Sequence, residues 1–501
     1  DSNIKKALEV SLQAGELVGA LYDALLKEYN NPEDKDTLHN LNVLCVRIVF
    51  CLYAEDAGLF GKRSMFHDYL KKYKGPSFRY ALIRLFAVLN QKPVDRDPYL
   101  EDDLATFPYV NGGLFDEEKI VVPRFNDEII DVILNKASAN FDWSKISPTI
   151  FGAVFESTLN PDTRREGGMH YTSIENIHKV IDPLFMDELN DRFEYIASLK
   201  TETIRNKHLK EFQDKLASLA FLDPACGSGN FLTETYISLR RLENKVVSEL
   251  HSGQVLIGDT DKFSPIKVSI SQFYGIEIND FAVTVAKTAL WIAESQMMKE
   301  TENIINAYLE FFPIENDANI VEGNALRMDW DDVVSSEKLN YIMGNPPFVG
   351  ARLMSSDQKN DIHFIFGKVW KNVGNLDYVS CWFKKSADYI KNTDIEVALV
   401  GTNSITQGET VVDLWEPLFN EGIVFNFAHK TFRWDSEASV KAKVHCVIIG
   451  FGRVNRKDRY IYSGDSEKKV DKINAYLVDA ENVFIQNRTK PICDVPNIGI
   501  G

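Results

Sequence analysis

The sequence lacks several features that would point to export, to a membrane or to a metal. Its six cysteines form no Cys-x-x-Cys pair and no zinc-like spacing, so reduced, buried thiols are the simplest interpretation and no metal is predicted. No apolar run approaches the roughly 20 residues that span a bilayer, and the first residues lack the apolar core of a signal peptide. We therefore expect a folded cytoplasmic protein that has no membrane partner.

The chain also lacks an excess of basic residues. Its formal net charge is −17, whereas non-specific affinity for DNA comes largely from Lys and Arg on phosphates. The overall charge therefore argues weakly against a DNA partner, although a local basic face or a basic domain elsewhere could overcome it. Internal repeats and low-complexity tracts are missing as well, so the chain is not a repeat array.

What the chain does contain is enough apolar sequence for several cores. It has 501 residues, of which 45% are hydrophobic, and this length favours two to four domains. It begins on Asp1 and stops at "PNIGIG" without an evident terminus, so we expect it to be part of a longer protein. Residues 1–160 carry apolar side chains at three- and four-residue intervals, which predicts a helical domain.

From Leu219 onward, short apolar runs alternate with helical segments. Seven of these runs are predicted strands: "AFLD", "FYGIEI", "ANIVEG", "LNYIMG", "VALVGT", "IVFNFA" and "KVHCVIIGF". Strand, helix and strand in succession imply right-handed parallel crossovers, so the predicted fold class is α/β, with a seven-stranded, mostly parallel, doubly wound sheet. Ligands of such sheets bind beyond the carboxyl ends of the strands, where the motifs should therefore cluster.

The first motif, "FLDPACGSGNFL", follows a predicted strand and opens a predicted helix. Gly227 and Gly229 allow close approach of a ligand to the backbone, and the first amides of the helix can bind an anion. The dinucleotide pattern would need glycine where Leu232 stands, so a ligand carboxylate is favoured over a pyrophosphate. A tight turn without a ligand is the alternative.

The next two strands end in residues that suit a nucleoside. Glu277 could accept both hydroxyls of a ribose, but it lies 48 residues beyond Gly229 instead of about 20, which requires an insertion. A solvated strand-end carboxylate is the alternative for Glu277. Asn324 and Leu326 could bind and cover an adenine ring. Together the three strand ends describe a nucleoside that bears an amino acid.

The fourth predicted strand ends in "GNPPF", which places a carboxamide beside two prolines and an aromatic ring. An aromatic amine such as that of adenine is a poor nucleophile. Two acceptors for its hydrogens, the Asn345 side-chain oxygen and the Pro346 carbonyl, would stabilise the charge that grows on it. The prolines fix the direction of that carbonyl, and Phe348 can stack on a base flipped out of a duplex.

In this order the motifs resemble those of the adenine-specific DNA methyltransferases that use S-adenosylmethionine. The matching segments are "GMHYTS", "DPACGSGNF", "GIEIND", "GNAL" and "NPPF", in the gamma arrangement with the target-recognition domain last. The segments "VRIVFCLYAEDAGLF" and "FPYVNGGLF" resemble the spacer of the type IIL single-chain restriction-modification enzymes. The resemblance implies a class I methyltransferase fold and methylation of the adenine 6-amino group in double-stranded DNA.

The resemblance also implies a set of site residues and domain boundaries. The catalytic residues would be Asn345, Pro346, Pro347 and Phe348, with Phe348 and Phe432 stacking on the base. The cofactor pocket would comprise Tyr171, Thr172, Asp223, Ala225, Gly227, Asn230, Phe231, Glu277, Ile278, Asn324, Ala325, Leu326 and Asn345. The domains would be a helical spacer over residues 1–160, the methyltransferase over 161–475 and the start of a linker over 476–501.

Two assignments stay open at this point. Trp434 competes with Phe432 as the second stacking aromatic, and either could instead belong to the core. Asp377, in "NLDYV", is either a site residue by resemblance or a carboxylate on a helix surface.

Other functions stay open as well. Asn-Pro-Pro-aromatic also suits a protein glutamine or RNA as methyl acceptor, and a subunit that binds cofactor and DNA without turnover is a further alternative. No D…E-x-K nuclease pattern is evident, so a nuclease and the target-recognition domain or subunit are expected outside this chain.

Overall fold

A computed structural model describes residues 2–110, 113–116, 120–159, 172–251, 265–312, 314, 317–434 and 444–486. The chain divides into two compact units. The first contains residues 1–344 together with 435–442, and the second contains residues 345–434 together with 443–501. The predicted helical, methyltransferase and linker domains divide the chain differently and stay a prediction.

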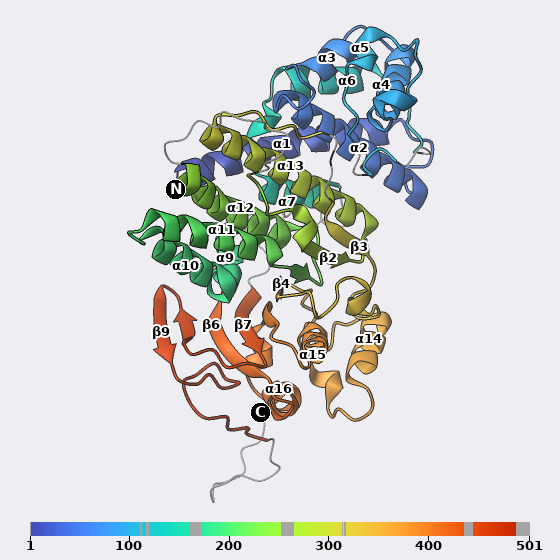
Figure 1. The fold of residues 1–501 in the computed structure, drawn as a ribbon. Coiled ribbons are helices and arrows are strands. Elements are labelled where there is room, and N and C mark those ends of the chain that lie inside the picture. The colour runs from blue at the N-terminus through green and yellow to red at the C-terminus, as the bar shows by residue number, and fades with distance from the viewer. Residues whose placement is uncertain are drawn as a thin grey trace, which may run out of the picture. The chain divides into compact units, whose positions relative to one another are not determined.

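The first unit contains most of the helices (Figure 1). They are α1 (Ser2–Leu26), α2 (Lys35–Asp56), α3 (Met65–Leu70), α4 (Pro76–Leu89), α5 (Asp102–Ala105), α6 (Asp127–Asp131), α7 (Pro148–Leu159), α9 (Ile174–Ile181), α10 (Asp187–Ala197), α11 (Glu202–Ser218), α12 (Asn230–His251) and α13 (Asp280–Ile305). Further helical segments, of the 3-10 or π type, are η1 (Pro93–Asp95), η2 (Val132–Ala139), η3 (Trp143–Lys145), η4 (Asp182–Met186), η6 (Ile270–Gln272) and η7 (Trp330–Asp332). Helices α1 and α2 confirm the prediction that the N-terminal region is helical, and α12 confirms the helix predicted after the glycine motif.

Helix α2 lies in the core of the helical region. By length and mean hydropathy it is the one helix in the described ranges that could cross a membrane, but 72% of its apolar window is buried inside the protein. Phe50 contacts Trp291 of α13 edge to face, with ring centroids 6.5 Å apart. The buried Arg47 donates its Nε–H to the carbonyl oxygen of Leu114 at 2.8 Å. These contacts are those of a core helix in a folded domain.

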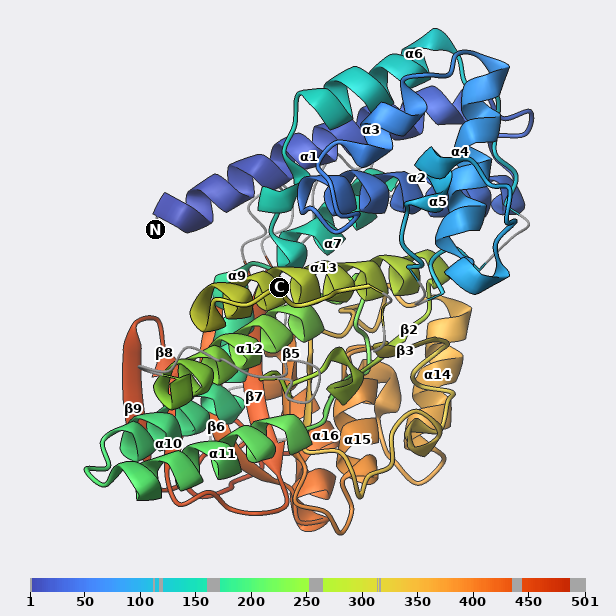
Figure 2. The same cartoon turned by 45° about the horizontal axis from the view of Figure 1, so that its top comes forward.

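Helices α12 and α13 pack against each other and, with α7, join the helical region to the first strands (Figure 2). The first unit holds β1 (Phe221–Asp223), β2 (Phe273–Glu277), β3 (Asn319–Glu322) and β4 (Tyr341–Gly344). Their order is β3-β2-β1-β4, and the registered pairs β1–β2, β1–β4 and β2–β3 are parallel. Because parallel strands end at the same edge of a sheet, the residues after β1, β2, β3 and β4 are brought to one edge.

The second unit contributes α14 (Ser356–Phe366), α15 (Ser380–Tyr389) and α16 (Thr410–Asn420), and the turns η8 (Val373–Asn375) and η9 (Asn403–Thr406). Its strands are β5 (Glu396–Thr402), β6 (Val424–Trp434), β7 (Val444–Gly452), β8 (Arg459–Ser463) and β9 (Ser466–Val470). Their order is β5-β7-β6-β8-β9. The pairs β5–β7, β6–β7 and β8–β9 are antiparallel, and β6–β8 is parallel.

The predicted α/β class is confirmed, but the predicted strand number is wrong because the sheet has nine strands in the part of the chain that the structure describes. The seven predicted runs correspond to β1 through β7. Sequence reasoning missed β8 and β9, a hairpin whose turn includes Gly464 at φ +56°. Four of the five β9 residues are exposed, so this edge strand carries no apolar run for a pattern search to find.

Candidate active site

The loop after β1 is shaped by two glycines that adopt left-handed backbone conformations. Gly227 has φ +52° and Gly229 has φ +81°. A Cβ on Gly229 would lie 2.8 Å from the Cβ of Ala286, so glycine lets this loop pack directly on α13. Directly after it, Asn230 opens α12 as a half-buried residue, and the ring of Phe231 is buried.

Glu277 joins the ends of three strands. Its side-chain Oε2 accepts a hydrogen bond from the Gly227 backbone N–H at 2.9 Å, and its carbonyl oxygen accepts one from Gly323 N–H at 2.8 Å. Its other carboxylate oxygen accepts from Asn279 N–H at 3.0 Å. Burial raises the pKa of this carboxyl, although these backbone hydrogen bonds act in the opposite direction. The structure therefore brings together the loops after β1, β2 and β3, as their motifs predicted.

The loop after β3 is held by its own asparagine. Asn324 is half-buried, and its side-chain Oδ1 accepts a hydrogen bond from Leu326 N–H at 2.9 Å. Ala325 and Leu326 are buried, and the carbonyl oxygen of Ala325 accepts from the indole N–H of Trp330 at 2.9 Å. Ile278, by contrast, is 67% exposed beside Glu277. The predicted adenine-binding residues thus lie on a loop with a defined conformation.

Asp223 ends β1 and is 1% exposed. Its Oδ1 accepts a hydrogen bond from Ala225 N–H at 3.0 Å, and a Cβ on Gly344 at the end of β4 would lie 2.5 Å from the same oxygen. Burial raises the pKa of this carboxyl to about 8, helped by the negative charge of Glu277. Asp223 therefore shapes the loop through Ala225, and Gly344 leaves the space that this carboxyl needs.

A cluster that sequence reasoning missed connects the helix after Thr172 to the helix after the glycine loop. His178 of α9 lies between two carboxylates, with Nδ1 2.8 Å from Asp182 and Nε2 3.2 Å from Glu234 of α12. The hydroxyl of Thr149 on α7 donates to the second oxygen of Glu234 at 2.8 Å. Hydrogen bonds to both carboxylates raise the pKa of His178 to about 10. Glu234 therefore ties α7 and α9 to the helix that begins at Asn230.

Thr172, a predicted cofactor residue, is half-buried and immediately precedes Ser173, whose side chain caps α9 by accepting from Asn176 N–H at 3.3 Å. Tyr171 lies outside the described residues. The sequence signal for the cluster was present only as a histidine and a glutamate that are 56 residues apart, which no local pattern connects.

In the second unit, the Asn-Pro-Pro-Phe segment is followed by a backbone anchor. Asn345 and Phe348 are half-buried, Pro346 is buried and Pro347 is exposed. Asp377 is 8% exposed, and one of its oxygens accepts from the N–H groups of Val349 at 3.3 Å and Val379 at 3.0 Å. Tyr378 N–H donates to the Val349 carbonyl at 3.0 Å. Asp377 is thus a buried anchor of the residue after Phe348, not a carboxylate on a helix surface.

Burial raises the pKa of the Asp377 carboxyl, although its hydrogen bonds to Val379, Val349 and Thr402 act in the opposite direction. The next residue, Tyr378, donates its phenol O–H to the buried Asp361 at 2.8 Å. The turn that begins at Asp377 is therefore fixed both at its backbone and at a side chain.

Phe432, the favoured second aromatic, lies half-buried on β6, opposite Cys446 of β7. Its ring centroid is 6.2 Å from that of His429, which in turn stacks on Tyr462 at 4.5 Å. The side chain of Trp434 lies outside the described residues. Phe432 is accordingly part of an aromatic cluster on β6 and β8.

No group of three or more His, Cys, Asp or Glu side chains arranged to hold a metal occurs in the described parts of the chain. Five cysteines within those parts are free and buried, namely Cys45, Cys51, Cys226, Cys381 and Cys446. Burial raises the pKa of each thiol for which a shift is resolved, which disfavours nucleophilic thiolates.

Two family models match the chain, one in its N-terminal region and one in the region that follows. Residues 199–463 match the family described as "MmeI, DNA-methyltransferase domain", and residues 39–115 match "MmeI, helicase spacer domain". The chain belongs to the MmeI family. It is 40% identical to DNA methyltransferase A of Bacillus subtilis (strain 168) over 506 aligned positions, which cover 99% of this chain and 55% of that protein.

The structure of the type IIL restriction-modification enzyme MmeI in complex with DNA matches the fold with a TM-score of 0.86. It is 41% identical, and the match covers 96% of this chain and 63% of that one. The resemblance to the spacer and methyltransferase of type IIL enzymes is thus confirmed. The MmeI-family chain spans about half to two thirds of the length of these relatives.

Proposed function

We propose that this chain transfers a methyl group from S-adenosylmethionine to the 6-amino group of a flipped-out adenine in double-stranded DNA, within a restriction-modification or related defence system. The proposal rests on one observation: this chain of the MmeI family combines two structural features. Glu277 links three strand ends in the first unit, and the Asn-Pro-Pro-Phe segment follows β4 directly.

The residues at the three strand ends fit the proposed cofactor. Each oxygen of the Glu277 carboxylate accepts one backbone N–H and keeps a lone pair to which a ribose hydroxyl can donate. Gly227 is half-buried in the loop after β1, where the lack of a side chain would let a ligand approach the backbone, and the loop of Asn324, Ala325 and Leu326 would border the adenine ring. When bound, S-adenosylmethionine supplies a methyl group activated by its attachment to a sulfonium.

The chemistry assigned to the second unit is acceptance of hydrogen bonds from the substrate amine. The Asn345 side-chain oxygen and the Pro346 carbonyl accept from the two amine hydrogens, which favours the form of the nitrogen whose lone pair is available. Pro346 and Pro347 have no N–H to compete for these acceptors. Phe348 and Phe432 would hold the extruded base by stacking, and Asp377 would hold Phe348 in place through Val349.

Duplex DNA is the proposed partner, and the bases of its target would be read by a recognition domain or subunit outside this chain. A nuclease outside this chain is proposed on the same basis. Methylation of a protein glutamine or of RNA is the second candidate, because Asn-Pro-Pro-aromatic suits planar amides and the net charge of −17 disfavours a polyanion.

Incubation with methyl-labelled S-adenosylmethionine tests these alternatives. Duplex DNA, RNA and protein extract are offered separately, and labelled DNA is digested to nucleosides. We expect label in duplex DNA as N6-methyl-2′-deoxyadenosine. Label confined to RNA or to protein, or a different methylated base in DNA, would contradict the proposal.

A further inference from the structure

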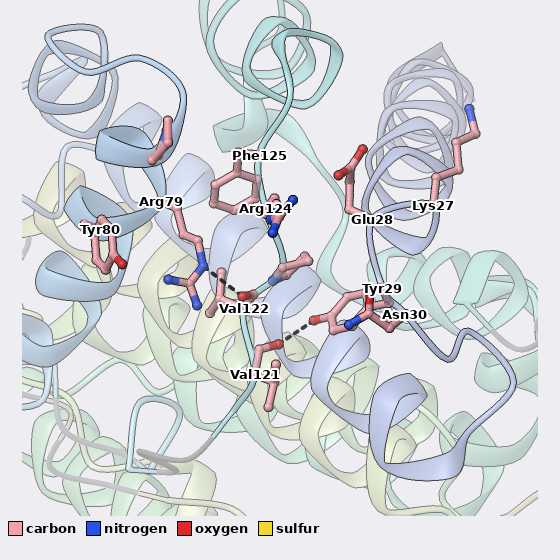
Figure 3. A pocket seen from close by; sticks show the side chains of 12 residues that line it. Lys27, Glu28, Tyr29, Asn30, Arg79, Tyr80, Val121, Val122, Arg124 and Phe125 are labelled. Carbon is pink, nitrogen blue, oxygen red and sulfur yellow. Dashed lines mark hydrogen bonds between the residues drawn. The ribbon is translucent and has the colours of Figure 1, made fainter.

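A concave site lies in the helical part of the first unit, and Figure 3 shows the side chains that line it. The cavity has a volume of about 720 Å³ and forms where residues 27–30, which follow α1, meet the start of α4 and residues 121–125. Nothing in the assignment of the methyltransferase site uses these residues. The cavity is therefore available for a separate binding role.

Its walls are held in place by hydrogen bonds between segments distant in sequence. The phenol O–H of the buried Tyr29 donates to the Val121 carbonyl at 2.6 Å, and Arg79 Nε–H donates to the Val122 carbonyl at 2.9 Å (Figure 3). The Arg79 guanidinium also lies over the ring of Tyr80, 5.4 Å from its centroid. Because these hydrogen bonds fix the carbonyl groups of two consecutive residues, Val121 and Val122, the cavity is formed before a ligand binds.

The lining is positively charged in a chain that is otherwise acidic. Lys27, Arg79 and Arg124 are its three cations, and Glu28 is the one carboxylate among the residues that line it. Glu28 accepts a hydrogen bond from the side chain of Asn126 at 2.7 Å. The local balance is thus +2 (three cations minus one carboxylate), against −17 for the whole chain.

The two cations at the rim are free to bind an anion. Arg124 is exposed, and Lys27 is 66% exposed, with its nearest carboxylate, on Glu128, at 3.9 Å and itself 58% exposed. An exposed pair at that distance contributes little stability, so Lys27 can exchange Glu128 for a ligand at little cost. Arg79 is already oriented, which reduces the entropy lost when it binds an oxyanion.

We propose that this cavity binds backbone phosphates of duplex DNA, which adds sequence-independent affinity to the methyltransferase; the inference rests on the proposed function. The ligand group is a phosphodiester, because the planar guanidinium groups of Arg79 and Arg124 and the flexible ammonium group of Lys27 can donate hydrogen bonds to its oxygens. The exposed ring of Tyr80 can lie against a deoxyribose. The positive charge of the cavity would also explain how a chain with a net charge of −17 binds a polyanion.

The test removes the two rim cations in the double variant Lys27→Ala/Arg124→Ala, because neither side chain takes part in the two hydrogen bonds that hold the wall. The control double variant Lys92→Ala/Lys200→Ala removes the same charge at two other exposed positions of the first unit. Binding of a 40-base-pair mixed-sequence duplex is measured by fluorescence anisotropy over a range of salt concentrations. Cofactor binding is measured by calorimetry for every protein.

We expect the rim variant to bind duplex about tenfold more weakly at moderate salt, with a slope of log Kd against log salt reduced by about 2, because each lost phosphate contact lowers it by about 1. The control variant should change affinity less than threefold, because more distant charges are screened. Cofactor affinity should be the same in all three proteins.

Equal duplex affinity and slope in the rim and control variants would overturn the phosphate site while leaving the proposed function intact. A wild-type chain that binds cofactor but no duplex at any salt concentration would overturn both. Inorganic phosphate is the second probe: if millimolar phosphate raises the melting temperature of wild type but not of the rim variant, and duplex binding is equal in both, the site takes free anions and the DNA assignment is wrong.

Discussion

The two compact units hold their candidate functional residues in different ways. In the first, Glu277 connects the loops after β1, β2 and β3 through three hydrogen bonds to backbone N–H groups. In the second, the Asn-Pro-Pro-Phe segment is followed by Val349, whose N–H donates to Asp377 and whose carbonyl accepts from Tyr378 N–H. Hydrogen bonds therefore connect three loops of the proposed cofactor site to one another, whereas the proposed catalytic segment is held through the one residue that follows it, Val349.

This difference predicts a division of effects. Changes at the strand ends of the first unit should alter cofactor affinity, and changes in the segment after β4 should alter turnover. A strand-end variant that changed turnover but not cofactor affinity, or a variant after β4 that changed affinity but not turnover, would contradict this division.

The largest effect is expected for Asn345→Ala. Removal of the side-chain acceptor should lower the rate of methyl transfer by about a hundredfold or more, because its contribution is made where charge grows on the amine. Cofactor affinity should stay within about threefold of wild type. Rates are measured with saturating DNA and affinity by calorimetry; turnover at the normal rate would show that Asn345 does not act on the amine.

A smaller effect on turnover is expected for Asp377→Ala, which removes the acceptor of two backbone N–H groups beside the catalytic segment. A displaced segment should lower kcat by about ten- to a hundredfold without changing the KM for cofactor. Asp377→Asn is the matched control, because both N–H groups donate to one oxygen, which the amide keeps. If the alanine and asparagine variants lost the same activity, the charge and not the anchor would be responsible.

For Glu277→Ala we expect weaker cofactor binding by about tenfold or more, since the backbone N–H groups of Gly227 and Asn279 lose their acceptor together with the ribose hydroxyls. Glu322→Ala is the matched control, because Glu322 is the registered partner of Glu277 on β3 and is exposed. Calorimetry gives both affinities. Unchanged affinity for Glu277→Ala would remove Glu277 from the cofactor site.

The smallest effect concerns His178 and pH. Its pKa is raised from 6.5 to about 10 in the folded protein, so its interaction with Asp182 and Glu234 is fully present below pH 6.5 and is lost as the pH rises through about 10. After a discount for partial solvent screening, the contribution is about 1 to 2 kcal/mol. His178→Gln should therefore lower the free energy of unfolding at pH 6 and have little effect at pH 10.5.

His208→Gln is the control, because His208 is a surface residue that contacts only Glu211 among the carboxylates within 4 Å in the described parts of the chain. Denaturant unfolding of wild type and both variants at the two pH values gives the comparison. The raised pKa of Asp223, about 8, also makes stability fall as the pH rises, so only the difference from wild type isolates His178. A His178→Gln effect of equal size at both pH values would contradict the ion pairing.

The amino-acid sequence determined the elements that depend on local pattern. Apolar runs at β1 through β7 and apolar periodicity at α1, α2, α12 and α13 are properties of short segments, and the carboxyl ends of strands could be matched to motifs because parallel strands end at one edge. The glycines at positions 227 and 229 marked the loop after β1 in the sequence, and the structure adds that both adopt positive φ angles, which glycine adopts readily.

Only the tertiary structure decided which distant residues meet. It placed Glu234 between His178 and Thr149, which lie 56 and 85 residues away, and it turned Asp377 from a possible surface carboxylate into the buried anchor of Val349. It also added β8 and β9, which pair with each other at the edge of the sheet. Because most side chains of β9 are exposed, its sequence has no apolar pattern that predicts a strand. Periodicity encodes which face of an element is buried, whereas a hydrogen bond between elements depends on how the whole chain packs.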